Sequence, residues 1–97
     1  MKINLTESGK QEILKQNTKD VGVRIYVSSM GWAGPSFSLS LEEATNDDVV
    51  KNVDGVKFVV DKMLDERFDA IKVDYGTMMF RKGFMVSLEG DNGGGCN

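Results

Sequence analysis

The chemistry that this sequence could carry begins with its single cysteine. Cys96 follows the glycines Gly93, Gly94 and Gly95, near the end of a chain of 97 residues. A thiolate on a glycine arm can reach a metal ion, a cluster or a partner thiol, and glycine amides can donate to sulfur. The alternative is a cysteine without a role. Because this position offers no packing reason for a cysteine, we favour the functional interpretation.

A second unusual position lies in the stretch Gly31-Trp32-Ala33-Gly34-Pro35, which holds the only Trp and the only Pro of the chain. Glycine and proline define such a turn without help from an indole. Two interpretations of Trp32 stay open. It folds back onto the sheet or anchors an interface, or it stands where a different side chain belongs.

The rest of the composition excludes several kinds of active site. The chain has no His, so neither a Ser-His-Asp nor a Cys-His mechanism can be assembled, and the commonest zinc ligand is missing. One cysteine cannot form an intramolecular disulfide. The methionines Met78, Met79 and Met85 have apolar neighbours, which favours core or sheet-edge filling over soft-metal ligation.

Carboxylates are numerous but stand in turns, helix caps and strand edges. We interpret most of them as solvated surface charge: Asp47, Asp48, Asp61, Asp65, Glu66, Asp69 and Asp74. Asp74, directly before Tyr75, is expected to orient the last hairpin.

Charge and hydropathy limit the kinds of partner that the chain can have. The net charge is −3, from 12 Lys and Arg against 15 Asp and Glu, and no basic stripe is present. We therefore expect no nucleic-acid partner. No apolar run approaches the ~20 residues that span a bilayer, and residues 1–6 lack the apolar core of a signal peptide. The sequence predicts a cytoplasmic protein without a membrane partner.

Apolar alternation and turn signals predict a mostly β domain of the α+β class, largely antiparallel, with one or two short helices packed on it. Thr6 and Asp61 are expected to cap the helices, and Ile13 and Leu14 to face the core. Asp54-Gly55 is a strong hairpin signal. The expected helices span 7–17 and 62–67. The expected strands span 21–27, 37–41, 49–53, 56–60, 71–75, 77–80 and 84–88, with the last turn at 81–83. Residues 1–90 are predicted to form one domain, and 91–97 a flexible tail carrying Cys96.

The order of these landmarks resembles the HesB/IscA family, the A-type carriers of iron–sulfur cluster assembly. Leu5-Thr6-Glu7 opens the helix, and Val23-Arg24-Ile25 leads into the Gly-x-x-Gly turn. The block 54–61 follows, then Asp74-Tyr75, then Gly83-Phe84-Met85-Val86 and the Gly/Cys tail. The resemblance covers nearly the whole chain and implies a small HesB-like antiparallel β-sandwich or barrel.

The family pattern also implies a ligand set. It has one cysteine in a Gly-Cys-x-Gly turn and two in a C-terminal Cys-Gly-Cys, which bind iron or an iron–sulfur cluster. Here Trp32 stands at the turn position, between Gly31 and Gly34, and Gly94 replaces the first tail cysteine. Gly95 and the metal ligand Cys96 remain.

A sub-branch resembles the chain more closely: short HesB-related proteins with a Gly-x-Ala-Gly-Pro turn, some with selenocysteine at the turn. Selenocysteine is encoded by UGA and Trp by UGG. Our hypothesis is that Trp32 marks a recoded or misread selenocysteine, and evolutionary loss of the ligand is the competing explanation.

The number of ligands per chain determines the oligomeric state and the cluster binding that we expect. Two soft ligands per chain need two chains to supply four, so a homodimer or larger assembly is expected. With Trp32, iron or cluster binding should be weak or absent. The predicted function is non-enzymatic transfer between iron–sulfur donors and apo-protein acceptors. Two alternatives remain: a thiol or selenol redox protein that pairs position 32 with Cys96, and a degenerate interaction module.

Overall fold

The structure is a computed structural model that describes residues 1–89. Within that range two helices and seven strands follow one another along the chain: β1 (Lys2–Leu5), α1 (Glu7–Gln16), β2 (Val23–Gly31), β3 (Gly34–Leu41), β4 (Asp48–Val53), β5 (Val56–Asp61), α2 (Lys62–Arg67), β6 (Ala70–Met78) and β7 (Arg81–Leu88). The predicted tail lies outside the described residues.

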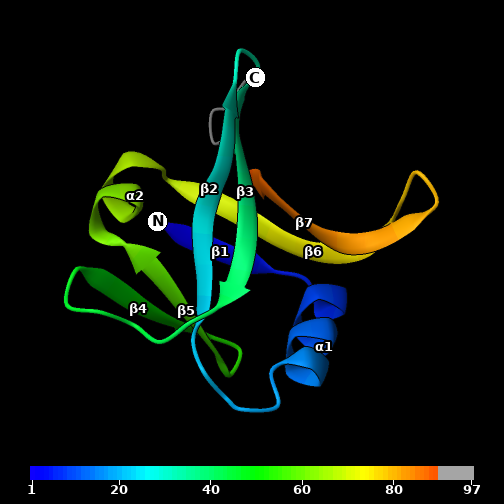
Figure 1. Cartoon of the computed structure of the whole chain (residues 1–97), viewed down its shortest axis with the longest axis horizontal. Coiled ribbons are helices and arrows are strands. Elements are labelled where there is room, and N and C mark those ends of the chain that lie inside the picture. The colour runs from blue at the N-terminus through cyan, green and yellow to red at the C-terminus, as the bar shows by residue number, and fades with distance from the viewer. Residues whose placement is uncertain (90–97) are drawn as a thin grey trace.

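The strands form two sheets (Figure 1). One has the order β3-β2-β5-β4 and the other β1-β6-β7. The mostly β prediction with two short helices is confirmed. The largely antiparallel pairing is also as predicted for β2–β3, β4–β5 and β6–β7, but it does not hold throughout. β1 pairs with β6, and β2 with β5, in parallel, and the two sheets of the described residues do not close into a barrel. Periodicity finds strands but not pairings between distant segments, and β1 was missed because it is only four residues long.

Local signals at the helix starts were informative. The Thr6 hydroxyl accepts a hydrogen bond from the Gly9 amide at 3.0 Å, and Asp61 accepts one from the Met63 amide at 2.8 Å. These caps satisfy amides that the first helical turn leaves unpaired. Ile13 on α1 is buried as expected. Leu14 is not, because the narrow apolar face of α1 leaves that side chain 52% exposed.

The core lies where the two sheets and α1 meet. It comprises Ile3, Ile13, Val23, Ile25, Phe37, Val56, Phe58, Val60, Ile71 and Val73. Strand β5 buries Val56, Phe58 and Val60 on one face, and Val59 on its other face is also fully buried. The segment at Gly22 covers it, and a Cβ added to Gly22 would lie 2.5 Å from Val59 Cγ2. This close approach requires glycine.

The last hairpin turns two residues earlier than predicted. Met78 pairs with Arg81, so Met79 and Phe80 form the turn, and Gly83 lies within β7 opposite Gly76. Both turn residues have positive φ angles, 51° and 69°. The predicted turn at 81–83 was based on glycine, and the structure places bulky residues in the left-handed conformation instead. No helix among residues 1–89 is long and apolar enough to cross a membrane.

Candidate functional site

The turn that carries Trp32 is the tip of the β2–β3 hairpin. Gly31 pairs with Gly34, and Trp32 and Ala33 connect them. Gly34 takes a positive φ of 120°, so the left-handed conformation falls on a glycine. Pro35 follows on β3, the edge strand of its sheet, where a residue without an N–H is tolerated.

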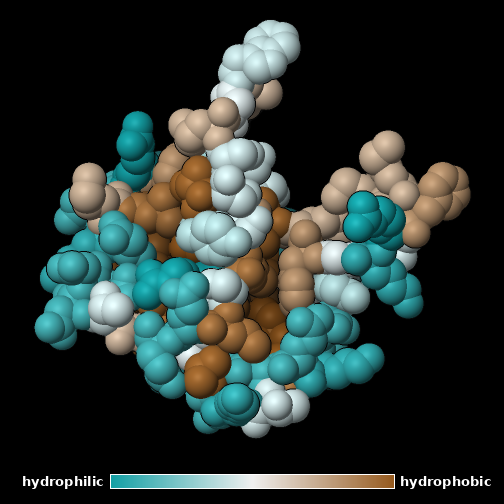
Figure 2. All heavy atoms as spheres, viewed as in Figure 1, coloured by the Kyte–Doolittle hydropathy of each residue, from teal (hydrophilic) through white to brown (hydrophobic). Residues whose placement is uncertain are grey.

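The tip stands clear of the rest of the protein (Figures 1 and 2). The Trp32 side chain is fully exposed, at 104% of its reference area, and Met30 is exposed as well. The interpretation in which Trp32 folds back onto the sheet is therefore wrong. An exposed indole at this position packs against nothing within residues 1–89, so it anchors no other part of that range.

A β-bulge, which sequence patterns did not reveal, separates the tip from the body. The pairing register of β2 and β3 shifts between Val27 and Ser29. The Ser28 hydroxyl donates to the Ser36 carbonyl at 3.2 Å across the bulge. Bulges bend a strand pair and re-aim the residues beyond it. This one sets the direction in which position 32 points.

One groove connects this tip with the end of the last strand. Residues at the start of β3 and at the end of β7 line a shared hollow of about 520 Å³, with Ala33 and Gly34 from one side and Ser87 and Leu88 from the other. The chain continues beyond Leu88 into Glu89 and the tail. Gly94, Gly95 and Cys96 lie outside the described residues, so the structure does not place them relative to Trp32.

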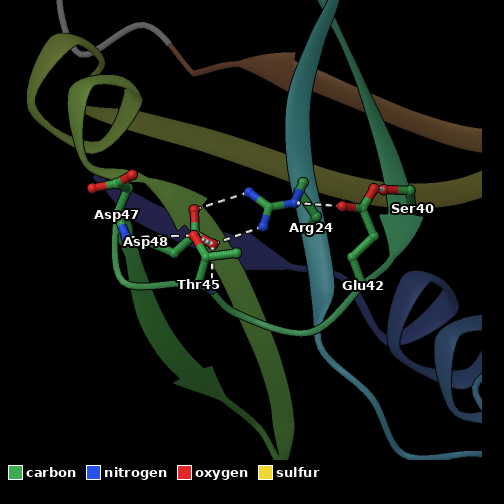
Figure 3. A network of polar contacts seen from close by, with 6 residues as sticks. All are labelled: Arg24, Ser40, Glu42, Thr45, Asp47 and Asp48. Carbon is green, nitrogen blue, oxygen red and sulfur yellow. Dashed lines mark hydrogen bonds and ion pairs between the residues drawn. The ribbon is translucent and has the colours of Figure 1, made fainter.

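The base of the β2–β3 hairpin is held by a charged network that the sequence did not indicate (Figure 3). Arg24 Nη1 and Nη2 donate to the two carboxylate oxygens of Asp48 at 2.9 and 2.7 Å, and Nε donates to Glu42 at 3.0 Å. Asp48 also accepts from the amide and hydroxyl of Thr45. Because Arg24 is central in its sheet, it holds the loop that crosses from β3 to β4.

The network perturbs the titration of its members. The Arg24 guanidinium, followed by the Thr45 amide, holds the pKa of Asp48 well below its usual range. The hydrogen bond from Ser40 is the largest contribution lowering the pKa of Glu42. The Asp48 side chain is only 2% exposed, so its interpretation as solvated surface charge is wrong. A partly buried bidentate pair of this geometry fixes loop and strand together.

Asp74 has the structural role expected of it. Its carboxylate accepts from the Thr6 hydroxyl at 2.7 Å and from the Tyr75 amide at 2.8 Å, and the Thr6 bond is the largest contribution lowering the pKa of Asp74. Thr6 also caps α1. Asp74 therefore ties the last hairpin to the start of α1, and the Tyr75 and Phe84 rings pack edge to face at 4.9 Å just beyond.

Comparison with known proteins gives the family. No family model matches the chain. It is 33% identical over 100 residues to an uncharacterized protein of the nifU 5' region of Azotobacter vinelandii, covering 97% of this chain and 94% of that one. It is 33% identical over 88 residues to the iron-binding protein IscA of Photorhabdus laumondii, covering 87% of this chain and 82% of the relative. The chain belongs to the HesB/IscA family of A-type iron–sulfur carriers.

Solved structures agree with this family assignment. The chain resembles Escherichia coli SufA, described as involved in biosynthesis of iron–sulfur clusters, with a TM-score of 0.69 and 26% identity over 98% of this chain and 88% of that one. It shares its fold with IscA crystallised with a [2Fe-2S] cluster, with a TM-score of 0.68 and 21% identity over 89% and 81% of the two chains.

Residues 1–89 of this HesB/IscA chain contain neither a cysteine nor a histidine. No group of three or more His, Cys, Asp or Glu side chains in that range could hold a metal ion. The indole of Trp32 is a hydrogen-bond donor only. The methionines Met78 and Met79 were expected to fill the core or a sheet edge, and both are exposed at the β6–β7 tip. That tip, like Arg24, was missed by sequence reasoning, although the run Met78-Met79-Phe80 before Arg81-Lys82 carried a signal.

Proposed function

We propose that this chain is a carrier-type protein of iron–sulfur cluster assembly whose cluster-ligand positions are residue 32 and Cys96. The observation that carries the proposal is the β2–β3 tip. Gly31 and Gly34 frame an exposed two-residue turn with the positive φ on Gly34, and the side chain at position 32 is fully open to solvent. A ligand for a transferable cluster must be reachable in this way.

The groove shared by the two strand ends supports the second half of the proposal. The tail 91–97 begins three residues beyond Leu88, which lines the same groove as Ala33. An extended chain spans ~3.3–3.6 Å per residue, so a tail from Glu89 to Cys96 reaches up to about 25 Å. Cys96 is proposed as the metal ligand, and Gly94 and Gly95 as the backbone that lets its thiolate approach. The proposed domain division is 1–90 and 91–97.

Ligand number determines what the chain does as it stands. Two chains with Trp32 supply two thiolates, whereas an ordinary iron–sulfur cluster needs four protein ligands. The chain is therefore proposed to load its iron–sulfur cargo weakly or not at all, and to act without catalysing a reaction, by ligand exchange with donors and acceptors. A cysteine or selenocysteine at position 32 completes four soft ligands in a homodimer.

The genomic codon for residue 32 tests the origin of Trp32. Under the proposal that the chain belongs to the selenocysteine-containing branch, the native codon is UGA. A native UGG codon shows instead that the ligand has been lost in evolution. Neither result changes the proposed ligand position, which the next experiment tests.

Anaerobic reconstitution with iron and sulfide tests the function. Iron and sulfide per chain and the visible absorption are measured for the native chain, Trp32→Cys and Ala33→Cys. The last variant is a matched control with a thiol one residue away in the same turn. We expect uptake by Trp32→Cys alone, lost again on adding Cys96→Ser. If Trp32→Cys takes up no cluster, the carrier proposal fails, and a disulfide between positions 32 and 96 in that variant would support the redox alternative. Equal uptake by Ala33→Cys would remove the special role of position 32.

A further inference from the structure

The β6–β7 hairpin ends in an exposed apolar tip. Met79 is 84% exposed and Phe80 102%, and Met78 before them is 53% exposed. The third strand of this sheet, β1, pairs with β6 only as far as Val73, so the outer part of the hairpin is a two-stranded ribbon that stands away from the body (Figures 1 and 2). Exposed apolar side chains gathered in this way mark an interaction surface.

The conformation of the turn indicates that these side chains are there for contact. Met79 and Phe80 both adopt the left-handed conformation, with φ angles of 51° and 69°. Bulky residues are unfavourable in that conformation, and Asn or Gly are the usual residues of such a turn. The same chain uses Asp54 and Gly55 for the equivalent positions of the β4–β5 hairpin. Forming the turn therefore gives no reason for methionine and phenylalanine.

The charge beside the tip has one sign. Arg81 and Lys82 directly follow Phe80, and no Asp or Glu occurs within residues 75–88. Since these two residues contribute +2 and the whole chain carries −3, the remaining residues carry −5. The hairpin is therefore basic on an acidic protein. A negatively charged surface would attract the tip and repel the rest of the chain.

The length of the ribbon reconciles these two effects. Strand β6 continues for five residues beyond Val73, to Met78. At ~3.3 Å per residue this is about 16 Å, whereas the Debye length at physiological ionic strength is about 8 Å. Repulsion between the acidic body and a surface that the tip touches is therefore largely screened. Arg81 and Lys82, at the outer end of the ribbon, keep their full attraction.

The shape of the tip favours a bilayer over a protein pocket. A protein partner would need a cavity that matches a narrow, convex projection, whereas the interfacial layer of a bilayer accepts a projecting side chain of any shape. Apolar side chains enter this layer, while Lys and Arg side chains reach the headgroups. We propose that the β6–β7 tip inserts into the surface of an anionic bilayer through Met79 and Phe80, with Arg81 and Lys82 on the lipid headgroups.

This proposal departs from the expectation of no membrane partner. That expectation was based on the net charge and on the lack of an apolar run long enough to span a bilayer. Both are properties of the chain as a whole, and an interfacial contact needs neither a spanning helix nor a basic protein. The proposal goes beyond the proposed function and does not rest on it, so it is tested on the full chain without iron.

The first test removes the apolar tip and keeps its charges. The double variant Met79→Asn/Phe80→Gly replaces the turn by Asn-Gly, the preferred pair for this geometry. Met63→Asn is the matched control, because Met63 is 77% exposed on α2, outside the hairpin. Flotation with phosphatidylcholine–phosphatidylserine vesicles over a lipid concentration series should give equal partition coefficients for the native chain and Met63→Asn. The coefficient of the tip variant should be at least about 30-fold lower, because two apolar side chains no longer leave water.

A second test removes the charges and keeps the apolar tip. Arg81→Gln/Lys82→Gln should lower partitioning into the anionic vesicles about 5-fold per charge, and should leave partitioning into pure phosphatidylcholine vesicles unchanged. Lys57→Gln/Lys62→Gln has the same net charge and alters two exposed positions outside residues 75–88. This control should bind like the native chain. Equal losses in the two double variants would show that net charge, not the tip, governs binding, and would overturn the proposal.

A third test locates the tip in the bilayer. Phe80→Trp is made together with Trp32→Phe, which removes the only other indole. Its emission should shift to shorter wavelength on the anionic vesicles and be quenched by lipids with brominated acyl chains, because the indole leaves water. Met63→Trp in the same background should show neither change.

Three results would overturn the proposal: no flotation of the native chain, native-like partitioning of the tip variant, and unchanged emission of Phe80→Trp on the vesicles. The first of these would leave a pocket on a protein partner as the occupant of the tip. Failed iron uptake by Trp32→Cys with vesicle binding intact counts against the proposed function alone.

Discussion

The two projecting hairpins, β2–β3 and β6–β7, make their turns in opposite ways. At the β2–β3 tip the positive φ falls on Gly34, which leaves position 32 free to carry any side chain. At the β6–β7 tip Met79 and Phe80 take the positive φ angles themselves, and Gly76 and Gly83 face each other within the strands. The first tip can exchange the side chain at position 32 without strain, whereas the second holds its apolar residues at a conformational cost.

The interactions that hold the two hairpins to the body of the protein differ as well. The β2–β3 hairpin is held by a charge pair, Arg24 with Asp48, whose side chains are 17% and 2% exposed. The β6–β7 hairpin is held by a carboxylate, Asp74, that accepts from the neutral hydroxyl of Thr6. Losing one partner of the Arg24–Asp48 pair leaves an uncompensated charge in a partly buried site, while losing the Thr6 hydroxyl leaves a carboxylate that water can reach. The β2–β3 base should therefore be the more sensitive of the two.

The largest expected effect tests that ranking. Asp48→Asn should lower the free energy of unfolding by about 3 kcal/mol, because it leaves the Arg24 guanidinium poorly compensated in a partly buried site. Urea unfolding followed by circular dichroism measures the change. Asp47→Asn, an exposed neighbour in the same loop, is the control and should stay within about 0.5 kcal/mol. Equal effects of the two variants would show that the ion pair does not hold the hairpin.

The next largest expected effect is an increase in the free energy of unfolding. Met79→Asn/Phe80→Gly should raise the free energy of unfolding by about 2 kcal/mol, because Asn and Gly accept the left-handed conformation that Met and Phe resist. The same urea titration measures it, with Met63→Asn as an exposed methionine outside the turn. A destabilised double variant would mean that the two side chains contribute packing to the monomer, which removes the contrast between the tips.

A smaller effect is expected at the other tip. A Cβ at Gly34 meets nothing within 4 Å, but its φ is 120°, so Gly34→Ala should cost about 1 kcal/mol from backbone strain alone. Gly31→Ala is the matched control, since a Cβ there lies 3.7 Å from its nearest neighbour, an ordinary contact. Thermal unfolding of both variants separates them. If Gly31→Ala is the more damaging, crowding rather than conformation governs this turn.

Sequence reasoning succeeded where the deciding interaction is local. The Thr6 and Asp61 caps depend on residues two or three positions away, and Asp54-Gly55 makes its turn within the dipeptide. It failed where the partner is distant in the chain. The parallel pairing of β1 with β6 and the Arg24–Asp48 pair join segments that no periodicity relates.

The candidate site shows the same division. The Gly-x-x-Gly turn at 31–34 could be predicted, because turn chemistry is local, and the structure confirms it. The strands nevertheless reach Gly31 and Gly34, where a longer loop was expected. The β6–β7 tip could not, because glycine at position 83 was a stronger turn signal than the pair at 79 and 80. The ligand role of position 32 and Cys96 stays a prediction.

The smallest expected effect is the pH dependence of the unfolding free energy that arises from the carboxylates at the foot of the two hairpins. The pKa values of Asp48 and Asp74 are both lowered in the folded protein, by the Arg24 and Thr6 hydrogen bonds respectively. In acid the unfolded chain therefore binds more protons at these carboxylates than the folded one does, so stability falls as pH decreases. The loss should begin near the ordinary Asp pKa of about 3.9 and continue below it.

The carboxylates Asp48 and Asp74 should each contribute separately to the loss of stability in acid. Asp48→Asn and Asp74→Asn should both flatten the fall in unfolding free energy below about pH 4, and Asp48→Asn should flatten it more, because its carboxylate faces a full positive charge. Urea titrations at closely spaced pH values between about 2.5 and 7 measure the slopes. A steeper contribution from Asp74 would reverse the ranking of the two bases and place the stronger restraint on the β6–β7 hairpin.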